Sequence, residues 1–220
     1  MIKPTSVSLT EATYHRTRAY ILSAQAKPDD KLKVADLAAM MEASPSVVRE
    51  ALSRLVSEGL VVAEPQRGFR VAPLELSDVR YLFDARIQIE CACLSGAIRN
   101  ADLTWESKLV AALHELTRTP EERGVQGDSV STHWAAAHAN FHQALVSTCP
   151  NPWYLKIRAN LYLHSERFLA LAMVSRPADR DLRAEHTEIA EAAIARDESA
   201  AQALMTLHLN RTVKEFCLSE

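Results

Sequence analysis

Four histidines in the second half of the chain have a spacing that would bring metal-ligating groups together: His138, His142, His186 and His208. The first two are four residues apart, so they share one face of a helix. The other two lie in separate later segments, expected to be antiparallel helices whose side chains can point back into one core. Imidazole is a common ligand for zinc and related ions, and the core of a helical bundle is a usual place for them. The sequence therefore predicts a buried metal site.

The alternative is that these histidines are polar residues in a hydrated cavity, which is the ordinary interpretation of a single buried histidine. The other histidines of the chain have no matching spacing and are interpreted as surface or helix-filling residues: His15, His114, His133 and His164. A metal-dependent enzyme is the least favoured function. Glu185 and Glu188 flank His186 without forming the His-Glu-x-x-His pattern of zinc hydrolases. Four histidine ligands would also occupy every position of a tetrahedral ion and leave none for a substrate.

A second group of candidate residues depends on a helix expected at 45–58. Ser44 has the side chain of a helix N-cap, and Pro45 suits the first turn. One face of this helix is apolar: Val48, Ala51, Leu52 and Leu55. A shorter helix, 34–41, precedes it. A first helix is expected at 10–26, with these inward-facing candidates: Ala12, Ala19, Ile21 and Leu22.

A β-hairpin is expected directly after the helix at 45–58. Gly59 ends the helix, residues 60–62 and 69–72 have strand character, and Arg67-Gly68 turns the chain between them. Helix, turn, helix and β-hairpin in this order predict a winged helix-turn-helix, whose second helix enters the major groove of DNA.

The charge balance restricts how such a module can hold DNA. With 25 basic and 28 acidic residues the net charge is −3, so no global positive field attracts the chain to nucleic acid. Any contact with DNA must come from a local patch, for which the winged segment supplies four arginines: Arg49, Arg54, Arg67 and Arg70.

The rest of the chain is helical in character and long enough to bury a core of its own. Helices are expected near 77–99, 102–118, 129–148, 152–174, 178–196 and 197–218. The predicted fold is mainly α, with a winged helix-turn-helix in residues 1–73 and an antiparallel all-helical bundle in residues 74–220. The polar N-terminus, the absence of an apolar run of spanning length and the scattered cysteines predict a cytoplasmic protein with free thiols.

The winged segment closely resembles the GntR family of bacterial transcription regulators. The matching elements, in the family's order, are Ser44, Val48-Arg49-Glu50-Ala51-Leu52, Leu55, Glu58-Gly59-Leu60 and Arg67-Gly68. The resemblance implies that Arg49 reaches base edges in the major groove. It also implies that Ser44, Ser46 and Arg54 contact phosphates or neighbouring bases, and that the Arg67-Gly68 tip enters the minor groove. The alternative is that Arg49 and Arg54 are solvated helix residues.

Three positions depart from the GntR pattern. Pro45 follows the motif serine where an arginine is usual, and Ala35 stands where an arginine is frequent at the start of the preceding helix. Glu42 occupies the turn position that is often glycine. Because two arginines expected to contact bases are missing, we expect an operator different from those of better-known members.

The helical part resembles the FCD domain, the effector domain of the FadR subgroup of GntR regulators. His142, His186 and His208 match its three metal-binding histidines, while His138 stands at the position of its aspartate. Four imidazoles make a neutral ligand set, so the ion keeps its full charge and attracts an anionic effector. Such a set favours zinc, with nickel as the next expectation, over manganese.

Residues Asp84 to Glu90 resemble the opening motif of the FCD domain, in which an arginine commonly faces the ligand cavity. Arg86 is therefore the candidate for binding an effector carboxylate through a bidentate fork. The alternative is an ion pair with Glu90, which is four residues away on the same helix. A polar stripe on the helix at 152–174 either lines the cavity or faces water: Asn160, His164 and Arg167.

These features predict a transcription regulator that responds to a ligand. A small carboxylate bound at the metal and Arg86 would shift the relative placement of two DNA-binding domains in a homodimer on a palindromic operator. A direct metal sensor, in which the ion itself is the signal, remains the alternative within the same class.

Overall fold

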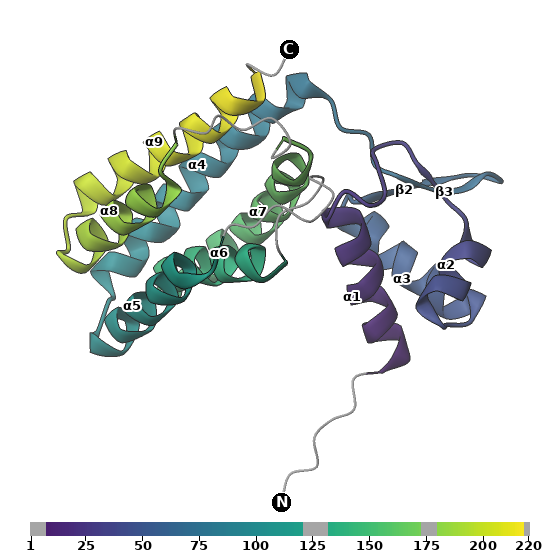
Figure 1. The fold of residues 1–220 in the computed structure, drawn as a ribbon, viewed down its shortest axis with the longest axis horizontal. Coiled ribbons are helices and arrows are strands. Elements are labelled where there is room, and N and C mark those ends of the chain that lie inside the picture. The colour runs from purple at the N-terminus through teal and green to yellow at the C-terminus, as the bar shows by residue number, and fades with distance from the viewer. Residues whose placement is uncertain (1–7, 121–131, 173–179, 218–220) are drawn as a thin grey trace, which may run out of the picture. The chain divides into compact units, whose positions relative to one another are not determined.

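The chain divides into two structural units, one ending at Glu75 and the other beginning at Leu76. The computed structural model describes residues 8–120, 132–172 and 180–217 (Figure 1). Several expected features lie outside the described residues: the first residues of the helices at 129–148 and 178–196, most of the loop from Pro120 to Asp128, and the break at Arg176-Pro177.

The first unit combines three helices with a small antiparallel sheet. Its elements are α1 (Leu9–Leu22), β1 (Lys31–Leu32), α2 (Val34–Met41), α3 (Pro45–Ser57), β2 (Val61–Glu64) and β3 (Gly68–Val71). The strand order is β1-β3-β2, with β2 and β3 forming the hairpin that follows α3. This is the expected winged helix-turn-helix.

Helix α3 forms for the reasons visible in the sequence. The Ser44 hydroxyl accepts a hydrogen bond from the Val47 N–H, and Pro45 lies in the first turn, so the orphan donors of the N-terminus are partly satisfied. The apolar face is fully buried, with no exposed surface on any of its four residues: Val48, Ala51, Leu52 and Leu55. This burial holds α3 against α1, and the opposite, polar face remains exposed.

Helix α1 differs from expectation in its end and in its buried face. It ends at Leu22 rather than at 26, because Ala24 adopts a left-handed backbone conformation with φ 57°. Ala19 is exposed, and the buried face consists of Thr13, Tyr14, Thr17 and Ile21. The hydroxyls of Tyr14 and Thr17 on this face are bonded, whereas the buried Thr13 hydroxyl has no hydrogen-bond partner among the described residues. The Thr17 hydroxyl donates to the Thr13 carbonyl at 2.8 Å, and the Tyr14 hydroxyl donates to Glu58.

Strand β1 was not expected from the sequence. It spans only Lys31–Leu32, which is too short to show an alternating pattern, and it pairs with β3 far along the chain. Two bonds just before it extend the pairing: the Asp29 N–H donates to the Val71 carbonyl, and the Val71 N–H donates to the Asp30 carbonyl. Tertiary pairing alone makes this segment a strand.

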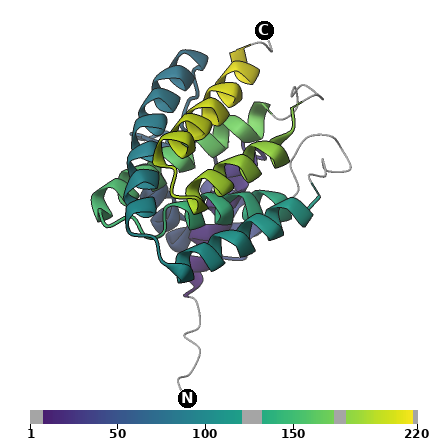
Figure 2. The same cartoon turned by 90° about the vertical axis from the view of Figure 1, so that its left-hand side faces the viewer.

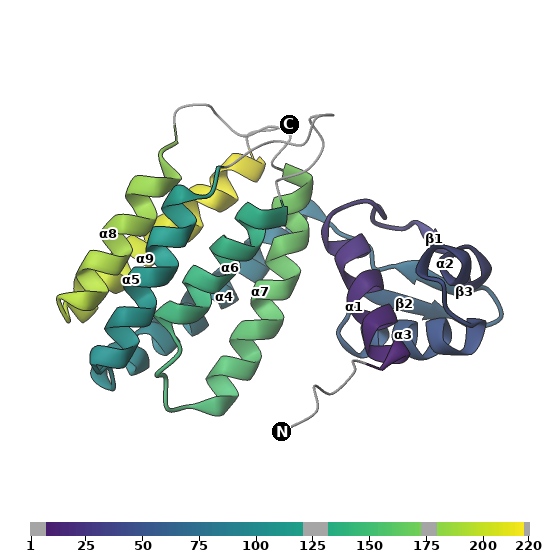
Figure 3. The ribbon, with the colours of Figure 1, turned by 60° about the horizontal axis from the view of Figure 1, so that its bottom comes forward.

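The second unit is a bundle of helices (Figures 2 and 3). Its helices are α4 (Leu76–Arg99), α5 (Leu103–Arg118), α6 (Thr132–Leu145), α7 (Pro152–Ala172), α8 (Leu182–Ile194) and α9 (Glu198–Cys217). Helix α4 packs against both α7 and α9, while α5 packs on α6 and α8 on α9. Five helices each contribute a side chain no more than 1% exposed to the core: Leu94, Trp105, Phe141, Ile189 and Met205. This core lets three helices point histidines at one place.

Candidate metal centre and DNA-reading surface

Four histidines form one buried cluster inside the bundle, as the sequence predicts. Helix α6 supplies His138 and His142, α8 supplies His186, and α9 supplies His208. One ring nitrogen from each lies within 4.8 Å of those of the others, and none of the residues is more than 6% exposed. The prediction that distant segments bring these rings together is confirmed.

Burial keeps these imidazoles in the uncharged form that can bind a cation. Removal from water lowers the pKa of His142 well below its usual 6.5, and the neighbouring rings, His138 first, lower it further. Burial likewise lowers the pKa of His186 and of His208. Each of these rings therefore keeps a nitrogen lone pair available near neutral pH.

Among the described residues, two buried nitrogens of the cluster find no hydrogen-bond partner: Nδ1 of His142 and Nε2 of His186. Buried polar atoms are nearly always paired, so orphaned atoms inside one polar cluster indicate a missing partner. The Nε2 atoms of His138 and His142 are also only 3.1 Å apart. Converging lone pairs of neutral imidazoles fit a divalent transition metal, for which nitrogen ligands at short range are the ordinary donors.

His138, at the position where the FCD pattern has an aspartate, is held from two sides. Its ring stacks on Trp134, with centroids 4.8 Å apart and planes 13° from parallel. Its Nδ1 lies 3.3 Å from the Tyr162 hydroxyl on α7. Because Nδ1 faces Tyr162, it is Nε2 of this ring that points toward His142 and the rest of the cluster.

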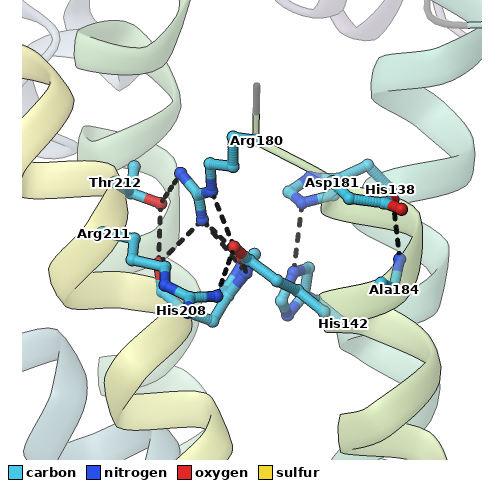
Figure 4. A network of polar contacts seen from close by, with 9 residues as sticks. His138, His142, Arg180, Asp181, Ala184, His208, Arg211 and Thr212 are labelled. Atoms are coloured by element: carbon cyan, nitrogen blue, oxygen red, sulfur yellow. Dashed lines mark hydrogen bonds and ion pairs between the residues drawn. The ribbon is translucent and has the colours of Figure 1, made fainter. Parts of the chain in front are cut away.

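His208 is held by a carboxylate on the neighbouring helix. Its Nδ1 lies 2.8 Å from Oε2 of Glu185, which in turn is bonded by Arg180 and Arg211. Arg180, Arg211 and Thr212 lie around His208 in Figure 4. Burial raises the pKa of Glu185, but the hydrogen bonds from His208 and Arg180 outweigh it, and the resulting pKa is well below the usual value. The carboxylate is therefore ionised throughout the physiological range.

Arg86 is buried beside this cluster, with only 2% of its surface exposed. Its Nη1 donates to the Ser165 hydroxyl at 2.6 Å, and its guanidinium carbon lies 4.7 Å from the centre of the Tyr162 ring. The expected alternative, a tight pair with Glu90, is not the main arrangement. The Glu90 carboxylate is 4.0 Å from Arg86 Nε but accepts a 2.8 Å hydrogen bond from Arg158. Arg86 Nε itself has no hydrogen-bond partner in the described part of the chain.

The other polar residues considered in the sequence lie outside the cluster. The remaining histidines on α1, α5 and α6 are exposed, as expected: His15, His114 and His133. The three polar residues of the stripe on α7 differ in solvent exposure: Asn160 is exposed, His164 is half-buried and Arg167 is buried. Asn160 therefore faces water rather than a cavity.

The candidate DNA-binding residues of the first unit lie on exposed positions at the start of α3 and at the hairpin tip. Ser44, Ser46 and Arg49 are exposed, and the hydroxyls of the two serines are 2.9 Å apart. Arg67 is exposed at the turn, next to Gly68, whose φ of 96° is one that glycine adopts without strain. A major groove can admit α3 with this face toward the bases.

Two other arginines of the expected patch are paired within the unit. Arg54 forms a 2.7 Å ion pair with Glu11 of α1, and its guanidinium carbon lies 3.9 Å from the centre of the Tyr14 ring. Arg70 pairs with Glu64 at 2.9 Å. Arg54 thus joins α3 to α1, and a contact with DNA from it remains a prediction.

The chain matches two known families, one for each unit. The family of bacterial regulatory proteins called GntR matches residues 9–71. The FCD domain matches residues 81–211, which is more than half of the chain. This chain belongs to the GntR family. It is one of the GntR regulators that carry an FCD domain.

Curated relatives and solved structures agree with this membership. The regulator is 37% identical over 207 residues to the HTH-type transcriptional regulator BphR of Paraburkholderia xenovorans strain LB400, covering 94% of this chain and 84% of BphR. It is 31% identical over 193 residues to the HTH-type transcriptional repressor GlaR of Escherichia coli K12, covering 86% of this chain and 87% of GlaR. The solved structure of E. coli McbR/YncC has the same fold, with a TM-score of 0.81 at 19% identity over 97% of this chain and 99% of that one.

The protein is therefore a transcription regulator with a winged-helix DNA-binding domain, and not an enzyme. Among the described helices, none has both the length and the apolar composition needed to cross a membrane.

Several residues that shape the histidine cluster were not found from the sequence. Trp134 and Tyr162 contact His138, and Glu185 and Arg180 hold His208. Glu185 had one available signal, since it directly precedes His186, but its partner lies on the next helix. The others carry no local pattern that separates them from ordinary helix residues.

Proposed function

We propose that this GntR regulator binds a divalent transition metal at the four histidines and a small organic acid beside it, and that the acid changes its affinity for operator DNA. The observation that carries this proposal is the convergence of four buried imidazoles from α6, α8 and α9 next to a buried arginine. An FCD domain joined to a winged helix supports a link between ligand binding and DNA binding.

His138, His142, His186 and His208 would hold the ion. Their donor set is neutral and consists only of nitrogen, which supports zinc first and nickel second. When bound, the ion supplies a positive charge that attracts and polarises an oxygen of an anionic ligand. The chain's own part is to present the four rings and to exclude bulk water, and burial also disfavours protonation of His142, His186 and His208.

Arg86 would bind the carboxylate of the effector. Its unpartnered Nε and the planar fork of its guanidinium suit an anionic oxygen pair, and Ser165 and the Tyr162 ring hold it in place. Arg158 donates the close hydrogen bond to the Glu90 carboxylate, so Arg86 does not have to neutralise that carboxylate alone. A buried cation attracts an anion more strongly than an exposed one because the surroundings have low polarity.

The first unit would read operator DNA as a homodimer in the cytoplasm. Arg49 would contact base edges in the major groove, Ser44 and Ser46 the phosphates, and the Arg67-Gly68 tip the minor groove. A dimer is expected because a two-fold axis in the protein matches a palindromic operator.

Fluorescence anisotropy of the purified regulator with DNA from its own promoter tests this proposal. We expect binding that prefers this DNA over random DNA, weakens as salt rises and changes when a carboxylate from a panel of small organic acids is added. Equal affinity for promoter and random DNA would refute the DNA-binding part. An affinity that no organic acid alters would refute the effector part.

A direct metal sensor is the second candidate, favoured by the cluster itself. Four imidazoles can fill a tetrahedral ion and leave no position for an organic ligand. This alternative predicts that a chelator alone switches DNA binding on or off. In the leading proposal, a chelator alone does not change DNA binding, because the change requires an added organic acid.

A further inference from the structure

The carboxylate of Glu185 connects two of the histidines across two helices. Glu185 immediately precedes His186 on α8, and it is only 6% exposed. Its side chain reaches α9, where Oε2 lies 2.8 Å from Nδ1 of His208. The residue that directly precedes one histidine of the cluster thus contacts the ring of another.

This contact decides which nitrogen of His208 carries the proton. A carboxylate in close ion pairs with two arginines is present as the anion, which can only accept hydrogen bonds, so the His208 nitrogen that faces it is the donor, Nδ1–H. In an uncharged imidazole the other nitrogen, Nε2, then keeps its lone pair. A carboxylate that fixes the orientation and tautomer of a histidine in this way also makes the opposite nitrogen a better metal ligand.

Two arginines hold the carboxylate in place. Arg180 donates to Oε1 at 2.9 Å and to Oε2 at 2.6 Å, and Arg211 donates to Oε1 at 2.9 Å. Arg180 also donates to the backbone carbonyl of His208 at 3.0 Å and to the Thr212 hydroxyl at 3.2 Å. The same guanidinium therefore fixes both the carboxylate and the backbone of the residue that the carboxylate orients.

We infer that Glu185, held by Arg180 and Arg211, is a positioning residue that keeps His208 in the tautomer whose Nε2 faces the other three imidazoles. This inference rests on the proposed metal site, to which it adds a residue that is not itself a ligand. The competing explanation is that Glu185 only ties α8 to α9. The two differ in whether the effect of Glu185 on metal binding passes through His208.

The first test measures zinc affinity of the full-length protein by competition with a chromophoric chelator. Glu185→Gln keeps the shape of the side chain but removes its charge, and we expect zinc to bind about 10–100-fold more weakly. Glu188→Gln is the matched control, because Glu188 is exposed on the same helix, and its affinity should equal that of the wild type. In a His208→Ala background, Glu185→Gln should cause no further loss.

The second test needs neither metal nor a Glu185 variant. Long-range ¹H–¹⁵N spectra of the metal-free wild type, with the His208 signals assigned through His208→Gln, report which ring nitrogen carries the proton. We expect protonated Nδ1 in His208 of the wild type. A protonated Nε2 there would overturn the inference, and so would an unchanged zinc affinity in Glu185→Gln or an equal further loss in the His208→Ala background.

The two proposals fail in different ways. Should the wild type bind no zinc at all, the proposed metal site is wrong, and with it the metal-positioning role of Glu185. Zinc bound tightly by the wild type and equally tightly by Glu185→Gln would leave the metal site standing and remove Glu185 alone.

Discussion

The replacement of His142 by leucine should have opposite effects with and without zinc. His142 has no exposed surface, and its Nδ1 has no hydrogen-bond partner among the residues that the structure describes. An unsatisfied buried polar atom costs about 1–3 kcal/mol, and a leucine of similar size has no such atom. We therefore expect metal-free His142→Leu to be at least as stable as the metal-free wild type.

With zinc the order should reverse, because binding to the folded state stabilises it by mass action. At a zinc concentration of a hundred times the dissociation constant this amounts to about 2.7 kcal/mol. In a domain of this size about 1 kcal/mol shifts the midpoint of thermal unfolding by about 2–4 °C, so the wild type should gain about 5–10 °C. His142→Leu loses one of four ligands and should gain little.

Thermal unfolding followed by circular dichroism, with and without zinc, measures both effects. His133→Leu is the control, because His133 is exposed on the same helix and should respond to zinc as the wild type does. The reasoning is refuted if zinc raises the midpoint of His142→Leu as much as that of the wild type. A metal-free His142→Leu that melts well below the wild type would show instead that the ring is already satisfied in the empty cluster.

Four further outcomes follow from the structure. Arg49→Ala should weaken promoter binding by about 1–3 kcal/mol in anisotropy titrations, while Arg118→Ala, an exposed change in the other unit, should leave it unchanged. Arg86→Lys should abolish the response of DNA binding to the effective organic acid without altering zinc affinity, since an ammonium lacks the fork; a retained response would exclude the role of Arg86. Ser44→Ala should lower the free energy of unfolding by about 1 kcal/mol, measured in urea, because α3 loses its N-cap bond; no change would contradict this. Burial raises the pKa of Glu166 from 4.5 to about 6, so the folded state holds its proton more tightly and stability falls as pH rises across that interval. Glu166→Gln should flatten that dependence in urea titrations, and an identical pH profile would count against it.

Much of the architecture follows from interactions within short stretches of sequence. The cap at Ser44, the apolar face of α3 and the Arg67-Gly68 turn each act within a few residues, so the winged helix follows from local chemistry. The six later helices were expected for the same reason. The pairing of His138 with His142 is also local, because it depends only on the period of a helix.

Other features required the folded chain. Strand β1 exists only because β3 offers it a partner. On the buried face of α1, Tyr14 and Thr17 are tolerated because Glu58 and a backbone carbonyl accept their hydroxyl hydrogen bonds. Sequence patterns assign such polar residues to the surface, since burial is favourable for them only when a bonding partner is present.

The sequence alone determined the two-part plan, the DNA-reading helix and the identity of four histidines with ligand chemistry. The meeting of the four rings in one buried cluster was predicted and is confirmed. The tertiary structure alone decided that Arg158 rather than Arg86 pairs closely with Glu90, and that Glu185 contacts His208 on the neighbouring helix. The physical reason is the separation along the chain over which each interaction acts. Helix periodicity and caps operate over a few residues, whereas the partner of a buried charge is set by which helices pack together.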